Sequence, residues 1–349
     1  MLFIIHELSL NGAAISLLQQ ARRMRADGHD VTILTPALSG AATALEGEFR
    51  DAGAAIVTRV AAQRHDVAVA CTIFSAGPLE GMIGLVPTVW WIKEGRAGVD
   101  QLIGQPALMR MLRRVDKVIF PGSGVVERVW AAMLGDLPPE RVAVVPNIIP
   151  PPPPTQPIAR PPGHARVICV GSIYPRKRQV DLVRAVAMLP GAPVQCVLVG
   201  EHVGLDPPGD ALIRAHPDRY VLTGGLQPDA LHAWYQSSDV FCLPSADECM
   251  PLTPIEAAWH GVPVVLSDLE CYRDFWRHGV NALIHPVGDV PILAWCLNLL
   301  LESPSLRARL AGAGRAVTSR FTGQCVGPLF DAALRDAIAR FGAAGALPR

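Results

Sequence analysis

The sequence predicts an α/β protein with two doubly wound parallel-sheet domains that face each other across a cleft. Two observations carry this prediction. Short apolar runs alternate with longer amphipathic segments in both halves of the chain, which is typical of repeated β–α units in a parallel sheet covered by helices. A stretch too rich in proline for regular structure, "PNIIPPPPPTQPIARPPG" at residues 146–163, separates the two halves.

The first half begins with an apolar strand at residues 1–5, an amphipathic helix at 14–27 and a second strand at 30–34. Further strands are expected at residues 54–57, 67–71, 86–92, 117–120 and 142–145. This pattern defines a first domain at residues 1–150, followed by a linker at 151–163.

The second half restarts the same pattern with a strand at residues 166–170 and a helix at 179–188. Further strands are expected at residues 193–199, 220–222, 240–243, 262–266 and 282–284, and helices at 254–260, 291–301 and 325–340. We place a second domain at residues 164–325, and a C-terminal helix at 326–349 that packs back toward the first domain.

The composition excludes several classes of protein. The chain has 349 residues, 31 basic and 31 acidic, so its formal net charge is zero and it is not a nucleic-acid binder that relies on a global positive field. Its eight cysteines form no C-x-x-C pair, which favours buried free thiols in a reducing cytoplasm over a zinc site or a disulfide framework. The N-terminus has no basic n-region, and no apolar run approaches ~18–20 residues. We therefore expect a cytoplasmic protein.

Two glutamates stand eight residues apart in "FCLPSADECMPLTPIEAAWHGVPVVLSD", at residues 241–268. Glu248 and Glu256 bracket a turn from a strand to a helix, where open α/β sheets bind nucleotides and sugar nucleotides. A structural interpretation is also open. Thr253 could be the N-cap of a capping box in which Glu256 reaches back to the cap amide, and Glu248 could be a solvated loop acid.

Four segments, in the right order and spacing, resemble the retaining glycosyltransferases of family 4 (glycosyl transferases group 1), which have the GT-B fold. They are "NGAAISLLQQARRMRADGHDVTILTP", "RVAVVPNIIP", "VGSIYPRKRQVDLVRAV" and "ECMPLTPIE" followed by "AAWHGVPVVLSD". The resemblance covers most of the chain and is strongest at residues 167–289. It implies two Rossmann-like domains, with the acceptor on the first and a nucleotide-sugar donor on the second.

The resemblance also implies roles for individual residues of the second domain. Glu256 would hold the ribose hydroxyls of the donor, and Glu248 would contact its sugar. A leaving diphosphate needs fixed positive charge and aligned amides. The residues expected to supply these are Lys177, Arg176 and Arg178, and the amides of Leu252 and Thr253.

Further site residues follow from the same resemblance. Gly224 lies where the family places loop backbone near the base, and Asn11 and Gly12 would let a loop of the first domain approach the donor. Alternatives remain open for some of these segments: "PRKR" could be a solvated charge run, and Asn11-Gly12 an ordinary turn.

The sequence departs from the family pattern at three positions. Ser172 stands where arginine is usual in the phosphate loop, and Pro251, which has no N–H, replaces a glycine. Lys93 stands where histidine commonly faces the reacting sugar. It could stabilise charge, bind an acceptor phosphate, or be a solvated lysine beside Glu94.

A basic stripe is predicted on one helix, because Arg110, Arg113, Arg114 and Lys117 have the spacing i, i+3, i+4 and i+7. Such a stripe could dock on an inner membrane face, where many family members use lipid-linked acceptors, or it could be a solvated helix face.

The function expected from the sequence is transfer of a sugar from a nucleotide-diphosphate donor to a hydroxyl of a glycan, lipid-linked or small-molecule acceptor. Retention of configuration is inherited from the resemblance. No Asp-x-Asp motif is present, so we expect a metal-independent enzyme without a further cofactor. Two alternatives remain open: a catalytically weak binding or scaffold protein with this fold, and a sugar-nucleotide epimerase.

Overall fold

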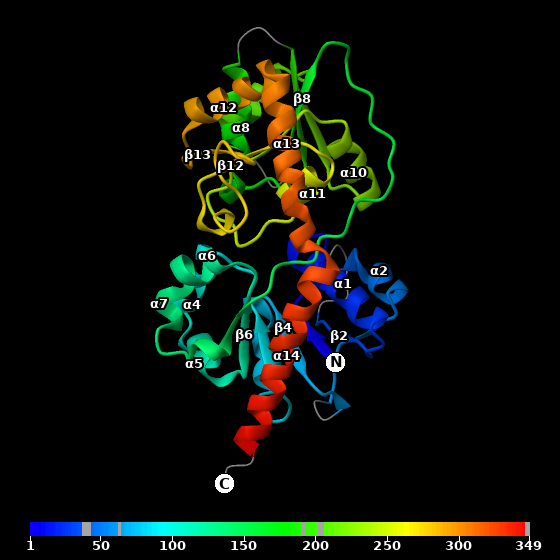
Figure 1. Cartoon of the computed structure of the whole chain (residues 1–349), viewed down its shortest axis with the longest axis vertical. Helices are drawn as coiled ribbons and strands as arrows, with labels where there is room; N and C mark the ends of the chain where they lie inside the picture. The colour runs from blue at the N-terminus through cyan, green and yellow to red at the C-terminus, as the bar shows by residue number, and fades with distance from the viewer. Residues whose placement is uncertain (37–42, 62–63, 190–192, 202–205, 346–349) are drawn as a thin grey trace. The chain divides into compact units, whose positions relative to one another are not determined.

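The computed structural model describes residues 1–36, 43–61, 64–189, 193–201 and 206–345. They fall into two compact units, Met1–Pro150 with Phe321–Arg349, and Pro151–Arg320. In Figure 1 the first unit carries the blue and cyan elements and the red C-terminal helix, and the second carries the yellow and orange ones. The last four residues of the helix predicted at 326–349 lie outside the described residues.

The first unit is built on a seven-stranded parallel sheet with the strand order β3-β2-β1-β4-β5-β6-β7. The strands are β1 (Leu2–Ile4), β2 (Thr32–Leu34), β3 (Ala55–Val57), β4 (Ala68–Cys71), β5 (Thr88–Trp91), β6 (Lys117–Phe120) and β7 (Val142–Val144). The helices are α1 (Gly12–Ala26), α2 (Glu46–Asp51), α3 (Ala76–Glu80), α4 (Arg96–Ile103), α5 (Pro106–Arg114), α6 (Ser123–Val125), α7 (Ala131–Leu134) and α14 (Gly323–Gly345).

Helix α14 is part of the first unit although it lies at the other end of the chain. It packs against β5, β6 and α1, and crosses the sheet in Figure 1. Its Phe330 is fully buried, with its ring centroid 5.2 Å from that of Trp91 and 6.3 Å from that of Phe3. Aromatic packing of this kind fixes the C-terminal helix on the N-terminal sheet.

The second unit is built on a six-stranded parallel sheet with the order β10-β9-β8-β11-β12-β13. The strands are β8 (Ala165–Val170), β9 (Val194–Val199), β10 (Tyr220–Gly224), β11 (Val240–Leu243), β12 (Val264–Ser267) and β13 (Leu283–His285). The helices are α8 (Gln179–Ala187), α9 (Pro207–Ala215), α10 (Pro228–Gln236), α11 (Thr253–Trp259), α12 (Val290–Glu302) and α13 (Pro304–Thr318). Helix α8 contacts α9 and α12, and α11 contacts α10 and α13, with α12 and α13 also in contact.

The predicted strands are confirmed, each to within two residues at either end. Their positions could be read from the sequence because strands of a parallel sheet are covered on both faces and are therefore continuous apolar runs. Both sheets have the doubly wound order in which the first strand of the unit neighbours the fourth, as predicted. The sequence analysis did not identify α9, α10 and α13 of the second unit, or α2, α3, α4, α6 and α7 of the first.

The prediction of a basic stripe ending at Lys117 is wrong. Helix α5 ends at Arg114, and Lys117 is the first residue of β6, where its side chain is only 5% exposed. Its Nζ donates to Asp336 Oδ2 at 2.7 Å and to the Glu140 carbonyl at 2.6 Å. The helical spacing failed because Val115, with ψ of 149°, is extended and turns the chain into the strand.

The remaining arginines of that stripe are partly paired. Arg113 lies 3.4 Å from Asp136, and Arg114 lies 3.0 Å from Glu80. Within the described ranges, no helix combines the length and apolar character needed to cross a lipid bilayer.

All eight cysteines are free thiols, and seven of them are buried, which confirms the prediction of buried thiols for all but Cys325. The described residues contain no group of three or more histidine, cysteine, aspartate or glutamate side chains placed to hold a metal ion.

Candidate functional site

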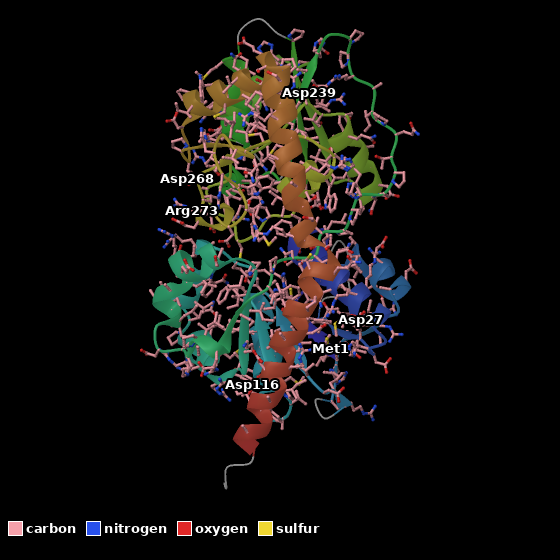
Figure 2. The ribbon with its side chains drawn as sticks, in the orientation of Figure 1. Met1, Asp27, Asp116, Asp239, Asp268 and Arg273 are labelled. Atoms are coloured by element: carbon pink, nitrogen blue, oxygen red, sulfur yellow. The ribbon has the colours of Figure 1, made fainter. Side chains whose placement is uncertain are left out.

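The candidate site of the second unit lies at the point where its strand order reverses. The chain runs outward from β8 through β9 to β10, and then returns to place β11 on the other side of β8. Ligands of such sheets bind at the carboxyl ends of the two strands that flank this switch point. Figure 2 labels one residue at each end of the strands: Asp268 directly follows β12 at the carboxyl end, and Asp239 directly precedes β11 at the amino end.

A lysine–glutamate pair occupies this switch point. Lys177 ends a short 3-10 helix (Pro175–Lys177) after β8, and Glu248 lies in the loop after β11. The Lys177 Nζ is 2.5 Å from Glu248 Oε1, and the Arg176 Nη1 is 3.6 Å from Glu248 Oε2. The Ser245 hydroxyl donates to Oε1 at 2.8 Å. Two cations and one hydroxyl therefore surround one carboxylate, whose side chain is only 7% exposed.

The electrostatics of this cluster keep Glu248 charged. Burial favours the neutral acid and would raise its pKa, but the charges of Lys177 and then Arg176 outweigh burial, so the pKa of Glu248 lies below its usual range. With Glu248 ionised, the three side chains carry a net charge of one positive unit. A cluster of this charge at a strand end is suited to bind an anionic group.

The two arginines that flank Lys177 have different partners. Arg176 donates to the Asp247 carbonyl and to the Tyr174 hydroxyl, which hold its guanidinium beside Glu248. Arg178 has a left-handed backbone, with φ of 52°, and its Nε donates to Asp181 Oδ2 at 2.6 Å. The structure therefore brings Arg176 together with Glu248 and pairs Arg178 with Asp181. "PRKR" is not a solvated charge run.

Close backbone packing shapes the strand ends around Ser172 and Gly224. A Cβ on Gly200 would lie 2.3 Å from the Gly171 carbonyl oxygen, so only glycine fits at that position. The Gly200 N–H donates to the Gly224 carbonyl at 2.9 Å, and Gln179 Nε2 donates to the Ser172 carbonyl at 3.0 Å. Ser172, in the loop after β8, and Gly224, at the end of β10, thus lie at the same carboxyl edge as Lys177.

The capping box, left open above as the structural interpretation of Glu256, does not form at α11. Leu252 is the N-cap residue, Thr253 is already helical, and no side chain caps the helix. The Thr253 Oγ1 is buried without a hydrogen-bond partner among the described residues. The N–H of Glu256 donates to the Leu252 carbonyl at 3.0 Å, so the helix starts one residue earlier than expected. The first turn is closed by backbone bonds, which leaves the Glu256 carboxylate for another partner.

That partner is Tyr235, on α10. Its hydroxyl donates to Glu256 Oε2 at 2.9 Å, and the tyrosine itself is fully buried. Burial raises the pKa of Glu256 to about 7, and the hydrogen bond from Tyr235 opposes this rise. Glu256 is therefore a carboxyl group whose charge changes near neutral pH.

In the first unit, Asn11 and Gly12 form the start of α1. The Asn11 Oδ1 accepts from the Ala14 N–H at 2.9 Å, and its Nδ2 donates to Glu7 at 2.9 Å and to Ser9 at 2.8 Å. Gly12 is the first helical residue, with nothing within 4 Å of an added Cβ. The segment is an N-cap after β1, at the switch point between β1 and β4, and not an ordinary turn.

Lys93 follows β5 and is held by side chains from distant segments. Its Nζ donates to Ser16 Oγ at 2.9 Å and to Asn147 Oδ1, and it lies 3.3 Å from the centroid of the Trp91 ring. Ser16 and Asn147 are both buried. The interpretation of Lys93 as a solvated lysine is therefore wrong, because its ammonium is fixed at the carboxyl edge of the first sheet.

Glu94 is a second, partly buried carboxyl group at this edge. Both of its oxygens lie 3.2 Å from the Ile73 N–H, and Oε2 accepts from the Lys93 N–H at 2.9 Å. Burial raises the pKa of Glu94 to about 7. These bonds stabilise a strained turn after β4, where Thr72 has φ of 79° and its Oγ1 lies 3.2 Å from His6 Nδ1.

Sequence reasoning missed several residues that contact the predicted ones. Ser245 stands directly after Pro244 at the end of a strand, and Asn147 follows Pro146 inside a motif already noted, so both had a local signal. Tyr235 had none, because an aromatic residue on an amphipathic helix usually indicates core packing.

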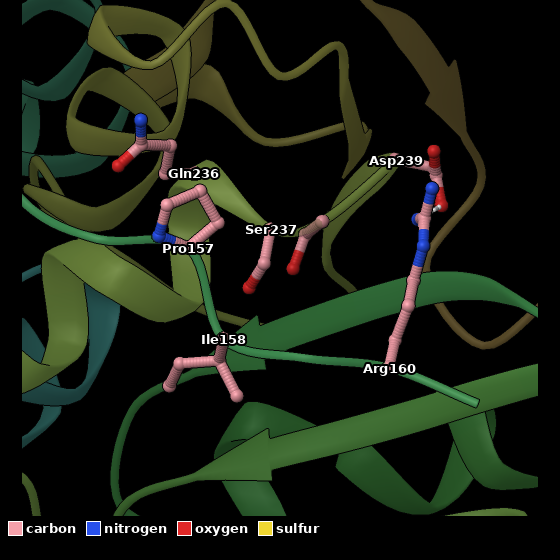
Figure 3. Close-up of a pocket in the computed structure, with 7 residues that line it drawn as sticks. Pro157, Ile158, Arg160, Gln236, Ser237 and Asp239 are labelled. Atoms are coloured by element: carbon pink, nitrogen blue, oxygen red, sulfur yellow. Dashed lines mark hydrogen bonds and ion pairs between the residues drawn. The ribbon is translucent and has the colours of Figure 1, made fainter. Parts of the chain in front are cut away.

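A cavity of about 250 Å³ lies at the opposite edge of the second sheet (Figure 3). Its lining includes Arg160 and Asp239, which pair with each other, and Asp239 also accepts from the Arg166 N–H. We do not assign it as the functional site, because its charged groups are already paired and it lies at the amino ends of the strands. A second cavity of about 280 Å³ lies beside Tyr174 and Arg178, next to the loop that carries Lys177.

Comparison with known proteins identifies both halves of the chain. A sequence model described as "Glycosyl transferases group 1" matches residues 155–317, and one described as "Glycosyl-transferase family 4" matches residues 1–134. Among solved structures, Anabaena Alr3699/HepE in complex with UDP and glucose superposes with a TM-score of 0.76 at 18% identity, covering 96% of this chain and 98% of that one.

Curated relatives match over shorter stretches. The phosphatidyl-myo-inositol mannosyltransferase of Mycobacterium leprae is 37% identical over 87 residues, which are 25% of this chain and 23% of the relative. The lipopolysaccharide core biosynthesis glycosyltransferase LpsE of Rhizobium meliloti is 30% identical over 148 residues, which are 42% of this chain and 43% of the relative. The matches thus span less than half the length of either relative. With both units matched in order, the chain belongs to the glycosyltransferases of group 1 and family 4 and has their GT-B fold.

Proposed function

We propose that the protein transfers a sugar from a nucleoside-diphosphate-sugar donor to an acceptor hydroxyl, with retention of anomeric configuration. The observation that carries this proposal is the cluster of Lys177, Arg176 and Glu248 at the switch point of the second sheet. Lys177 and Glu248 stand in the two segments that resemble the family's phosphate loop and its glutamate pair. Its net positive charge suits a leaving group that becomes more negative as the glycosidic bond breaks.

The candidate site residues of the second unit then have the following roles. Lys177 and Arg176 stabilise the charge that develops on the leaving diphosphate, assisted by the amides of Leu252 and Thr253 at the start of α11. Glu248, held ionised, accepts from hydroxyls of the transferred sugar, and Glu256 accepts from the ribose hydroxyls. Arg178 and Ser172 shape the phosphate loop, and Gly224 supplies backbone near the base. Fixed cations take the place of a metal ion in this proposal.

The acceptor belongs to the first unit in this proposal. Lys93 presents a fixed ammonium there for an acceptor phosphate or a developing charge, in contact with Ser16 of α1, the helix that Asn11 and Gly12 begin. The names of the relatives, which refer to phosphatidyl-myo-inositol and to the lipopolysaccharide core, support a lipid-linked or glycan hydroxyl. A cytoplasmic location accords with the seven buried free thiols.

The test is a panel of UDP-, GDP-, ADP- and dTDP-sugars incubated with the protein and followed by mass spectrometry, with UDP-glucose first because of the HepE complex. We expect slow release of one nucleotide with free sugar, lost in Glu248→Ala and Glu256→Ala. Interconversion of the intact nucleotide sugar would favour an epimerase. Absence of both turnover and binding for the whole panel would overturn the proposal and favour a scaffold protein.

A further inference from the structure

Tyr235 contacts the candidate site from a buried position. Its ring packs against Phe241 of β11, with a centroid distance of 6.1 Å, and stacks on His260 at 5.9 Å and an interplanar angle of 24°. These contacts fix the ring, and its hydroxyl donates to Glu256 Oε2 at 2.9 Å. Hydrogen bonds to a carboxylate are shorter and stronger than those between neutral groups. The bond therefore restricts the orientation of Glu256 as well as its charge.

The surroundings of Glu256 contain no other hydrogen-bond donor to its carboxylate among the described residues. The titratable groups near the Tyr235–Glu256 pair are His232 from α10, His260 directly after α11, and Cys169 from β8. Asp229 of α10 acts on His232, and Arg315 of α13 acts on His260. The two histidines bond each other, with Nδ1 of His232 3.0 Å from Nε2 of His260.

Neither histidine places a positive charge beside the Glu256 carboxylate near pH 7. Burial, and then the charge of His232, lower the pKa of His260 to about 4, and burial also lowers that of His232. Both rings are therefore neutral near pH 7. Cys169 is a buried thiol whose pKa burial raises to about 12, so it is neutral as well. The Tyr235 hydroxyl is left as the group that favours the charged form of Glu256.

We propose that Tyr235 is a positioning residue for donor binding, which holds Oε2 of Glu256 and leaves Oε1 to accept from a ribose hydroxyl of the donor. This inference rests on the proposed function. Without the phenolic hydroxyl, the carboxylate is free to rotate and takes up a proton at a higher pH. A protonated Glu256 is a poorer acceptor, so donor affinity depends on pH through this residue.

The experiment compares Tyr235→Phe with a matched control, Tyr220→Phe. Tyr220 is a buried tyrosine of the same unit whose hydroxyl donates to the Val183 carbonyl at 3.0 Å and does not contact Glu256. Binding of the donor selected by the panel, UDP-glucose first, is measured by calorimetry between pH 5.5 and 8.5. The sugar-linked diphosphate has no proton that titrates in this range, so the pH dependence reports on the protein.

We expect wild-type affinity to fall below a midpoint near pH 7, where Glu256 titrates. In Tyr235→Phe the midpoint should rise by about one pH unit, with donor binding ~10-fold weaker at pH 6.5, as expected for loss of one hydrogen bond to a charged group. Tyr220→Phe should keep the wild-type midpoint, and Glu256→Gln should bind weakly at every pH.

An unchanged midpoint in Tyr235→Phe, with a normal wild-type curve, would overturn the role of Tyr235 alone. Equal shifts in both tyrosine variants would also overturn it, because they would report a general loss of packing. If wild type binds no donor of the panel, the proposed function fails, and the role of Tyr235 in donor binding fails with it.

Discussion

Glu248 and Glu256 lie in one strand-to-helix segment, yet their surroundings differ in almost every respect. Glu248 has Lys177 at 2.5 Å, Arg176 at 3.6 Å and the Ser245 hydroxyl at 2.8 Å. Glu256 has one neutral donor, the Tyr235 hydroxyl. The charges around Glu248 outweigh its burial and lower its pKa, whereas burial dominates at Glu256 and raises its pKa to about 7.

Two identical side chains of one motif can therefore have different chemical roles. Glu248 is ionised at neutral pH, and it and the two cations beside it hold one another in place. The charge of Glu256 changes with pH in the neutral range, because burial raises its pKa to about 7. The proposed roles agree with this difference. The carboxylate that contacts the sugar beside the reacting bond needs to stay charged, whereas the affinity of a carboxylate for the ribose hydroxyls can vary with pH.

The largest expected effect comes from removing the cation nearest to Glu248. Lys177→Met should lower kcat/KM for sugar transfer by ~10²–10³-fold, as for loss of one donor to a developing negative charge. It also leaves a buried carboxylate without its main partner, which should reduce the free energy of unfolding by about 3 kcal/mol. Transfer kinetics and urea unfolding measure the two effects.

The control for this variant is Arg184→Met, which breaks the half-exposed pair with Asp206 in the same unit. Exposed pairs contribute little, so we expect a change in unfolding free energy below ~1 kcal/mol. A Lys177→Met enzyme that retains more than a third of wild-type kcat/KM would show that Lys177 does not serve the leaving group.

The second strongest effect is expected for donor binding when Glu256 is changed. Glu256→Gln keeps the size of the side chain and removes its charge, so donor binding at pH 8 should weaken by ~10–100-fold, the range for hydrogen bonds to a charged group. Calorimetric titration measures it, with Glu302→Gln at the exposed end of α12 as the control. Unchanged donor affinity would separate Glu256 from the donor site.

The two glutamates should affect stability with opposite signs as the pH changes. Glu256 binds a proton more tightly in the folded protein, with a pKa of about 7 against about 4.5 in the unfolded chain, so wild type loses stability as the pH rises through this window. The full effect is roughly 1–3 kcal/mol, and we expect the lower part because the side chain keeps some solvent access.

Urea unfolding of wild type and Glu256→Gln between pH 4.5 and 8 measures this contribution. The variant should gain on wild type as the pH rises, whereas parallel curves would contradict a raised pKa. Glu248, with its lowered pKa, behaves in the opposite way. Its contribution is complete above the unfolded pKa near 4.5 and is lost as the pH falls below that value.

The smallest effect concerns Ser245. Ser245→Ala removes the hydroxyl bond to Glu248 but leaves both cations, so we expect a loss of ~1 kcal/mol in stability and transfer rates within about threefold of wild type. Ser238→Ala, which breaks a serine bond to the Trp234 carbonyl, is the matched control. A drop in activity as large as that of Lys177→Met would mean that Glu248 depends on its hydroxyl neighbour rather than on its cations.

Much of the fold could be predicted from local pattern. Apolar runs located the strands, and the order of elements predicted a doubly wound sheet in each half, because parallel strands are covered on both faces. Predictions from residue spacing were wrong at two positions. Lys117 continued a helical stripe but lies in β6, and Thr253 has the sequence of an N-cap although the helix begins at it.

From the sequence alone it follows that Lys177 stands in the segment after β8, and Glu248 and Glu256 in the segment from β11 into α11. The tertiary structure decided their chemistry. The partner of Glu248 is 71 residues away in the chain, and that of Glu256 is 21 residues away on a helix that local pattern did not identify. Charge and orientation depend on distances in space and on burial, and neither is encoded in the spacing of a motif. For that reason one segment contains a carboxylate that is ionised at neutral pH and a carboxyl group that titrates near neutral pH.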